Sequence, residues 1–134
     1  ELFLIIVAIP PSNSILGYFL RYIGNVGEII PKLKSSKTVT LVFLAPTREE
    51  LVFRGIPLLL TESLLSAPFL LSIALFTYFH KRNYAYGFVW IMPLFVLGAI
   101  ILSYIATKFG LMWAIVAHIV NNLYAKLWIS WKER

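Results

Sequence analysis

The uncharged stretch AYGFVWIMPLFVLGAIILSYIAT, residues 85–107, limits most strongly how this chain can fold. A helix needs about 20 consecutive apolar residues to cross a bilayer, and this stretch is long enough. Residues 2–20 and 63–79 are also uncharged. Because 60% of the residues are hydrophobic and 13% are charged, the chain carries more apolar surface than a core of its size could bury. These features predict a helical protein that crosses the membrane several times.

Prolines and charged loops divide the chain into segments. Pro10 and Pro11 end the first apolar run, so residues 1–9 are too short to span a bilayer alone, and the basic sequence PKLKSSK at residues 31–37 predicts a loop. The segments that we expect to be helical are residues 12–30, 38–61, 63–80, 86–108 and 111–131. The sequence thus predicts an all-α, polytopic bundle of about five transmembrane helices, in which short loops make neighbouring helices antiparallel.

The basic loop also marks a boundary along the chain. We expect residues 1–37 to be upstream helices followed by this loop, and residues 38–134 to be a four-helix core. The chain begins at Glu1, without methionine and without basic residues ahead of its first apolar run, so it does not resemble a signal peptide. We expect instead that the numbering begins inside a longer product, with further helices ahead of it.

The charges of the loops predict the orientation of the helices. If the last four segments alternate in direction, their loops lie on two faces of the membrane. One face receives Lys32, Lys34, Lys37, Lys81, Arg82, Lys132 and Arg134. The second face receives only Lys108 and Glu62. Since loops rich in lysine and arginine usually stay in the cytoplasm, we expect the first face to be cytoplasmic. The net charge of +6 then indicates contact with the anionic lipid bilayer and no binding of nucleic acid.

A cluster of charges interrupts an apolar segment at PTREELVFRG, residues 46–55. A charge at the centre of a membrane helix costs at least about 2.5–3.5 kcal/mol, so such residues usually face the interior of a bundle and have a function. Glu50 and Arg54 are four residues apart with the acid first, an order that favours an ion pair on a helix. Glu49 lies about 100° around the helix from Glu50 and cannot share Arg54 in the same way. Glu49 therefore needs another explanation.

Three further polar side chains lie on other apolar segments. His80 ends the sequence LSIALFTYFH, and His118 and Asn122 lie one turn apart on one face of WAIVAHIVNNLYA. A single histidine inside a membrane can simply be a structural hydrogen-bond donor. The chain has two histidines in total, however, and both lie on segments next to the glutamate pair. The combination favours a shared site.

These residues form three short motifs, which occur in order on three apolar segments. EELVFR fits EExxxR, FTYFH fits FxxxH from Phe76 to His80, and HIVNN fits HxxxN. Over residues 38–131 the chain resembles the CPBP family of intramembrane proteases, which includes the CAAX prenyl endopeptidases and bacteriocin-processing or self-immunity proteins. The resemblance implies a four-helix catalytic core and a glutamate-type endopeptidase.

The resemblance also implies a role for each site residue. Glu49 would be the general base that activates water, His80 would share or orient that water, and His118 and Asn122 would form an oxyanion hole. The supporting residues would be Glu50, Arg54 and Phe76. The substrate would be a membrane-anchored or prenylated peptide, either a CAAX tail or a bacteriocin leader, and it would reach the site from the cytoplasmic face.

We expect no cofactor, and two alternatives to a protease stay open. The absence of cysteine excludes disulfides and cysteine-ligated zinc, but Glu49, His80 and His118 would offer a carboxylate and two imidazoles to a divalent metal such as zinc. The first alternative is a catalytically silent family member that acts as a subunit of a larger membrane complex. The second is a membrane protein with a haem between the two histidines, which would leave Glu49 and Asn122 unexplained.

Overall fold

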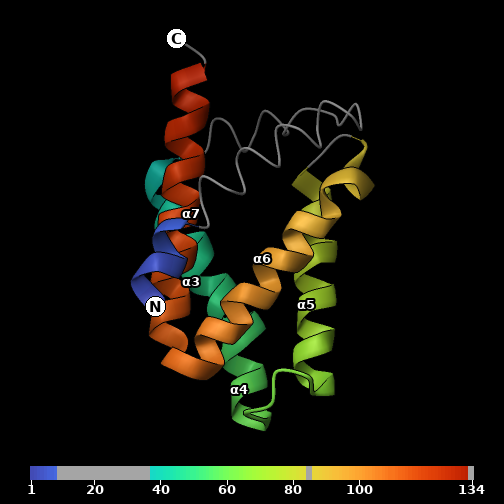
Figure 1. Cartoon of the computed structure of the whole chain (residues 1–134). Coiled ribbons are helices and arrows are strands. Elements are labelled where there is room, and N and C mark those ends of the chain that lie inside the picture. Colours follow the sequence, from blue (N-terminus) through green and yellow to red (C-terminus); the bar gives the residue numbers. More distant parts are fainter. Residues whose placement is uncertain (9–36, 84–85, 133–134) are drawn as a thin grey trace.

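The computed structural model describes residues 1–8, 37–83 and 86–132. Within these ranges the regular structure is entirely helical and comprises five successive helices (Figure 1). The prediction of an all-α fold is therefore confirmed for this part of the chain. The predicted helix over residues 12–30 and nearly all of the basic loop at residues 31–37 lie outside the described residues.

The helices follow the apolar segments of the sequence. The first covers residues 2–8, and the second runs without a break over residues 38–60. The second helix consists of η1 (Thr40–Leu44), α3 (Ala45–Glu50), η2 (Leu51–Gly55) and α4 (Ile56–Leu60). The remaining elements are α5 (Ala67–His80), the 3-10 turn η3 (Lys81–Asn83), α6 (Phe88–Phe109) and α7 (Leu111–Lys132). Of the described helices, α6 alone is long and apolar enough to cross a membrane by length and composition.

The wide π-helical turn η1 precedes Pro46 and leaves a backbone carbonyl free. Proline has no N–H to donate, and its ring crowds the carbonyl of the preceding turn. The N–H of Ala45 bonds to the carbonyl oxygen of Thr40, so it is not available to Leu41. The next residue that could serve Leu41 is Pro46 itself. The Leu41 carbonyl can therefore accept a hydrogen bond from another helix.

The second wide turn, η2, ends two residues before Pro57. The carbonyl oxygen of Phe53 lies four residues before this proline and receives no N–H from it. The hydroxyl of Ser72 on α5 donates a hydrogen bond to this oxygen. Each proline of the second helix thus creates a point at which another helix can bind the backbone.

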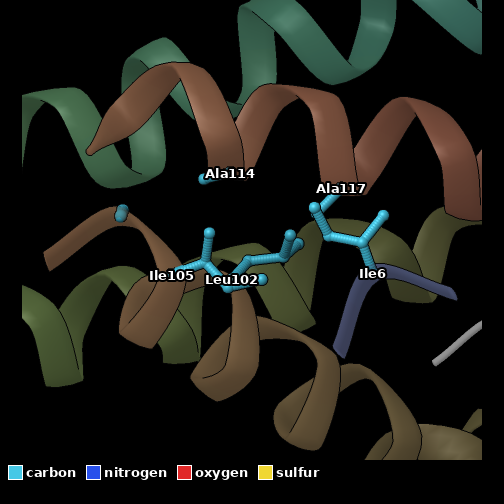
Figure 2. Packing of buried hydrophobic residues seen from close by; sticks show 6 residues of the cluster. Ile6, Leu102, Ile105, Ala114 and Ala117 are labelled. Atoms are coloured by element: carbon cyan, nitrogen blue, oxygen red, sulfur yellow. The ribbon is translucent and has the colours of Figure 1, made fainter. Parts of the chain in front are cut away.

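Helices α6 and α7 form an antiparallel pair that turns at Gly110 (Figure 1). Gly110 has a φ of +100°, a conformation that residues with a side chain rarely adopt. The pair packs through a core that also takes in the first helix (Figure 2). The buried members of this core are Ile6, Leu102, Ile105, Ala106, Ala114 and Ala117. Small residues in such a seam let two helix backbones come close together.

The junction between α3 and η2 lies where the other helices meet. Helix α7 packs on η1 and α3, whereas α5 packs on η2 and on α6. The η2 turn also contacts α6 and α7. The charged cluster at residues 48–54 lies at this junction, where Glu50 and Arg54 are buried and Arg48 is exposed.

Ala114 offers a test of the seam between α6 and α7. Its side chain is fully buried, so the Ala114→Leu substitution adds methyl groups where no space is left. We expect a loss of about 1–3 kcal/mol in the free energy of unfolding, because overpacking forces the two helices apart. Val116→Leu, at an exposed position of α7, is the matched control and should change stability by less than about 0.5 kcal/mol. Denaturant titration in detergent, followed by circular dichroism, measures both; equal stability of the two variants would contradict the packing.

Candidate active site

The structure brings together residues from all three motifs. Glu49 and Glu50 end α3, and Arg54 lies one turn later in η2. Phe76 and His80 lie at the carboxyl end of α5, and His118 and Asn122 lie in the middle of α7. The second helix thus supplies the acids, and the two helices that pack against it supply the histidines.

Glu50 is the buried partner of the glutamate pair. Its side chain has no exposed surface, and its Oε1 lies 3.0 Å from Arg54 Nη1, the ion pair that the spacing predicts. The same oxygen lies 2.7 Å from His118 Nδ1. Glu50 therefore connects the second helix to α7 through a short hydrogen bond with a charged acceptor, which is stronger than a hydrogen bond between neutral groups.

Arg54 extends this buried network to α5 and α6. Its Nη2 donates to the carbonyl oxygen of Ala99 on α6 at 3.3 Å, and its guanidinium carbon lies 4.4 Å from the centre of the Phe76 ring. A guanidinium over an aromatic face is attracted by the electrons of the ring. The charge is thus neutralised by Glu50 and shielded by Phe76, which lowers the cost of burying it.

Glu49 points in a different direction and is 24% exposed. Its Oε2 lies 3.9 Å from His80 Nε2 and 3.7 Å from His118 Nε2. The two adjacent glutamates therefore have separate surroundings: Glu50 is enclosed by its ion pair, and Glu49 faces both histidines from the edge of the site. The difference of about 100° in direction between neighbouring residues of a helix is the cause.

Aromatic rings hold the two imidazoles in place. Phe76 contacts both rings, with centroid distances of 4.3 Å to His80 and 5.9 Å to His118. Phe95 on α6 makes a second ring contact with His80, with a centroid distance of 4.8 Å. The Nδ1 atom of His80 lies 2.8 Å from the carbonyl oxygen of Phe76. Phe76 thus orients His80 through its ring and through its backbone, which explains the spacing of the FxxxH motif.

The exposed side of Glu49 lines a pocket of about 320 Å³. His80 lines the same pocket, which places a carboxylate and an imidazole at its wall. The remaining lining residues are Arg48, Val52, Phe53, Phe79 and Asn83. The wall of the pocket therefore combines apolar side chains with the guanidinium of Arg48 and with the two motif residues Glu49 and His80.

Asn122 forms a hydrogen bond with the second helix. Its Nδ2 donates a hydrogen bond of 3.0 Å to the carbonyl oxygen of Leu41, the acceptor that Pro46 leaves free. The described part of the chain contains no hydrogen bond from Asn122 to Glu49 or to either histidine. The observed role of Asn122 is therefore to tie α7 to the second helix.

Asn122→Ala tests this tie. We expect the substitution to lower the free energy of unfolding by about 0.5–1.5 kcal/mol, because the Leu41 carbonyl loses its donor. Asn121→Ala removes the same side chain one residue earlier and should cost less. Unfolding in detergent compares the two variants, and a larger loss for Asn121→Ala would refute the assignment.

Several contacts of the site could not be recognised in the sequence. Phe95 is one of many aromatic residues on its segment, and the carbonyl groups of Ala99 and Leu41 carry no residue-specific signal at all. The prolines at positions 46 and 57 offered a partial indication, because each removes a backbone donor. Among residues 1–8, 37–83 and 86–132, no three histidine, aspartate or glutamate side chains are arranged to hold a metal ion.

Comparison with known proteins connects this geometry to a family. The family model described as type II CAAX prenyl endopeptidase Rce1-like matches residues 32–124, which is more than half of the chain and includes every residue of the site. No curated protein and no solved structure gives a significant match.

Proposed function

The chain belongs to the Rce1-like family of type II CAAX prenyl endopeptidases, and from this premise we propose that it is an intramembrane endopeptidase with Glu49 as its general base. The family is one of membrane-integral proteases. The observation that carries the proposal is the meeting of Glu49 Oε2 with two imidazole nitrogens, at 3.7 Å and 3.9 Å, beside a pocket.

The proposed reaction is hydrolysis of a peptide bond by an activated water. Glu49 takes a proton from the water while the water oxygen bonds to the peptide carbon, and the electrons of the carbonyl double bond move to its oxygen. When this intermediate collapses, the carbon–nitrogen bond breaks and the proton passes to the leaving nitrogen. A carboxylate within hydrogen-bond reach of the water can act as the base in the first transfer and, once protonated, as the acid that supplies the proton in the second.

The other motif residues have roles around this step. His80, oriented by Phe76, shares the water with Glu49. We propose His118 and Asn122 for the stabilisation of the oxyanion. An amide group has two N–H bonds, so the hydrogen bond to Leu41 leaves Asn122 one donor for this purpose.

The exterior of the protein supports the proposal of a bundle embedded in lipid. Helix α6 has the length and apolar character of a membrane span. Large apolar side chains are exposed on every long helix of the described structure, with Leu59 at 86% and Met112 at 71% as examples. Such side chains would meet lipid in a membrane and water otherwise. The basic residues Lys81 and Arg82 directly after His80 support a site that opens toward the cytoplasm.

The pocket supports a particular class of substrate. Its apolar wall suits a peptide with apolar residues near the cleaved bond, and the guanidinium of Arg48 suits a free terminal carboxylate at short range. A prenylated peptide that ends a few residues after its lipid-bearing cysteine combines both features. A leader peptide anchored in the membrane lacks the nearby carboxylate.

A cleavage experiment in water labelled with ¹⁸O tests the proposal. The purified protein in detergent is incubated with farnesylated peptides that end in a free carboxylate, with the same peptides amidated at that end, and with membrane-anchored leader peptides. We expect mass spectrometry to find cleavage of the first set with one ¹⁸O atom in the new carboxyl group. Cleavage of leader peptides alone would overturn the substrate class. A folded protein that cleaves none of the three would favour the silent subunit.

A further inference from the structure

Both imidazole rings of the site have an acceptor next to Nδ1. His80 Nδ1 lies 2.8 Å from the carbonyl oxygen of Phe76. A backbone carbonyl can accept a hydrogen bond but cannot donate one, so a neutral His80 ring carries its proton on Nδ1. Its Nε2, the atom that faces Glu49, then has a lone pair and no proton.

Glu50 places His118 in the same tautomer. Its Oε1 lies 2.7 Å from His118 Nδ1 and 3.0 Å from Arg54 Nη1. A guanidinium can only donate, and a carboxylate that is paired with it is an acceptor. The hydrogen bond to His118 must then come from an N–H on Nδ1, and the lone pair of a neutral ring is on Nε2.

Two further acceptor atoms, His80 Nε2 and His118 Nε2, therefore each lie near Glu49 Oε2. The distances of 3.7 Å and 3.9 Å from the carboxylate to the two nitrogens are too long for direct hydrogen bonds. A donor that lies about 2.8 Å from two atoms at this separation has room to bond to both. A water molecule has two hydrogens to donate, and its lone pairs would stay free to attack a carbonyl carbon.

We propose that Glu50 is a positioning residue that holds His118 with its proton on Nδ1, so that His118 Nε2 meets the water as a proton acceptor. The catalytic consequence rests on the proposed function. His118 cannot donate to an oxyanion until Nε2 has gained a proton, and the attacking water supplies it through Glu49. The new Nε2–H bonds to the oxyanion, and this proton passes to the leaving nitrogen when the carbon–nitrogen bond breaks. Deprotonation of water and stabilisation of the oxyanion are thereby coupled through one ring.

The tautomer can be measured without a substrate. The chain has two histidines, so protein labelled with ¹⁵N-histidine gives two rings, which His80→Gln assigns. We expect the nitrogen NMR shifts and one-bond N–H couplings of the neutral parent to place the proton on Nδ1 in both rings. A proton on Nε2 of His118 in the parent protein would overturn the inference while leaving the proposed protease activity untouched. If both rings have the expected tautomer but the parent protein cleaves no peptide, the proposed function would be refuted instead.

A pair of variants separates the role of Glu50 from general structural support. Glu50→Gln keeps an oxygen that can accept the Nδ1 proton, and the double variant Glu50→Leu/Arg54→Met removes the acceptor without leaving an unpaired charge. We expect Glu50→Gln to keep the parent tautomer and the double variant to shift the His118 proton toward Nε2. The signals of His80, which is held by a backbone carbonyl, should stay the same in both. An unchanged His118 tautomer in the folded double variant would contradict the positioning role.

Discussion

Glu49→Gln is expected to slow peptide cleavage by about 10²–10⁴-fold, the range typical of a lost general base. The amide has nearly the shape of the carboxylate but cannot take a proton from water. Because Glu49 is 24% exposed and has no ion pair with Arg54, we expect the free energy of unfolding to change by less than about 0.5 kcal/mol. Initial rates of peptide cleavage in detergent measure the first effect, and denaturant titration measures the second.

Glu62→Gln is the matched control for Glu49→Gln. Glu62 lies on the exposed turn between α4 and α5, so its substitution removes the same charge from the protein outside the site. Its cleavage rate should equal that of the parent. If both variants keep more than about a tenth of the parent rate, Glu49 is not the base, and another acceptor at the site must take its place.

Glu50→Leu is expected to lower the free energy of unfolding by about 3–5 kcal/mol. Glu50 is fully buried and Arg54 is 1% exposed, so the substitution leaves a guanidinium inside the protein without its counter-charge. Two buried polar atoms of this pair, Glu50 Oε2 and Arg54 Nε, already lack a hydrogen-bond partner in the described structure. Few other contacts can therefore stabilise the Arg54 charge once the carboxylate is removed.

The double variant Glu50→Leu/Arg54→Met decides whether the charge itself is the cause. Replacing both members of a buried ion pair with apolar residues of similar volume is often neutral or stabilising. We therefore expect the double variant to recover most of the stability lost by Glu50→Leu when unfolding is followed by circular dichroism. If it is as unstable as the single variant, the shape of the two side chains matters more than their charges.

Features that depend on residues close together in the sequence could be predicted, whereas contacts between distant residues could not. The helices expected over residues 38–61, 63–80, 86–108 and 111–131 are found at residues 38–60, 67–80, 88–109 and 111–132, because apolar runs and their breakers are local features. The largest difference is at the start of α5, where residues 61–66 form a turn instead of the first helical turn. The pairing of Glu50 with Arg54 was also predictable, since residues four apart share one face of a helix. The hydrogen bond between Asn122 and Leu41 was not, because Pro46 indicates a missing backbone donor but does not show which distant side chain binds the free carbonyl.

Three features could be read from local patterns in the sequence: the helical character of the described segments, the limits of the apolar runs and the residues of the three motifs. Each of these depends on neighbours within a few positions of the chain. Which glutamate is enclosed and which faces the histidines depends on contacts between distant segments. Glu50 and His118 are 68 positions apart, and their contact depends on how far the second helix and α7 are rotated about their axes. A rotation of about 100° would exchange the two glutamates, and only the packing of α5, α6 and α7 around η2 selects between these arrangements.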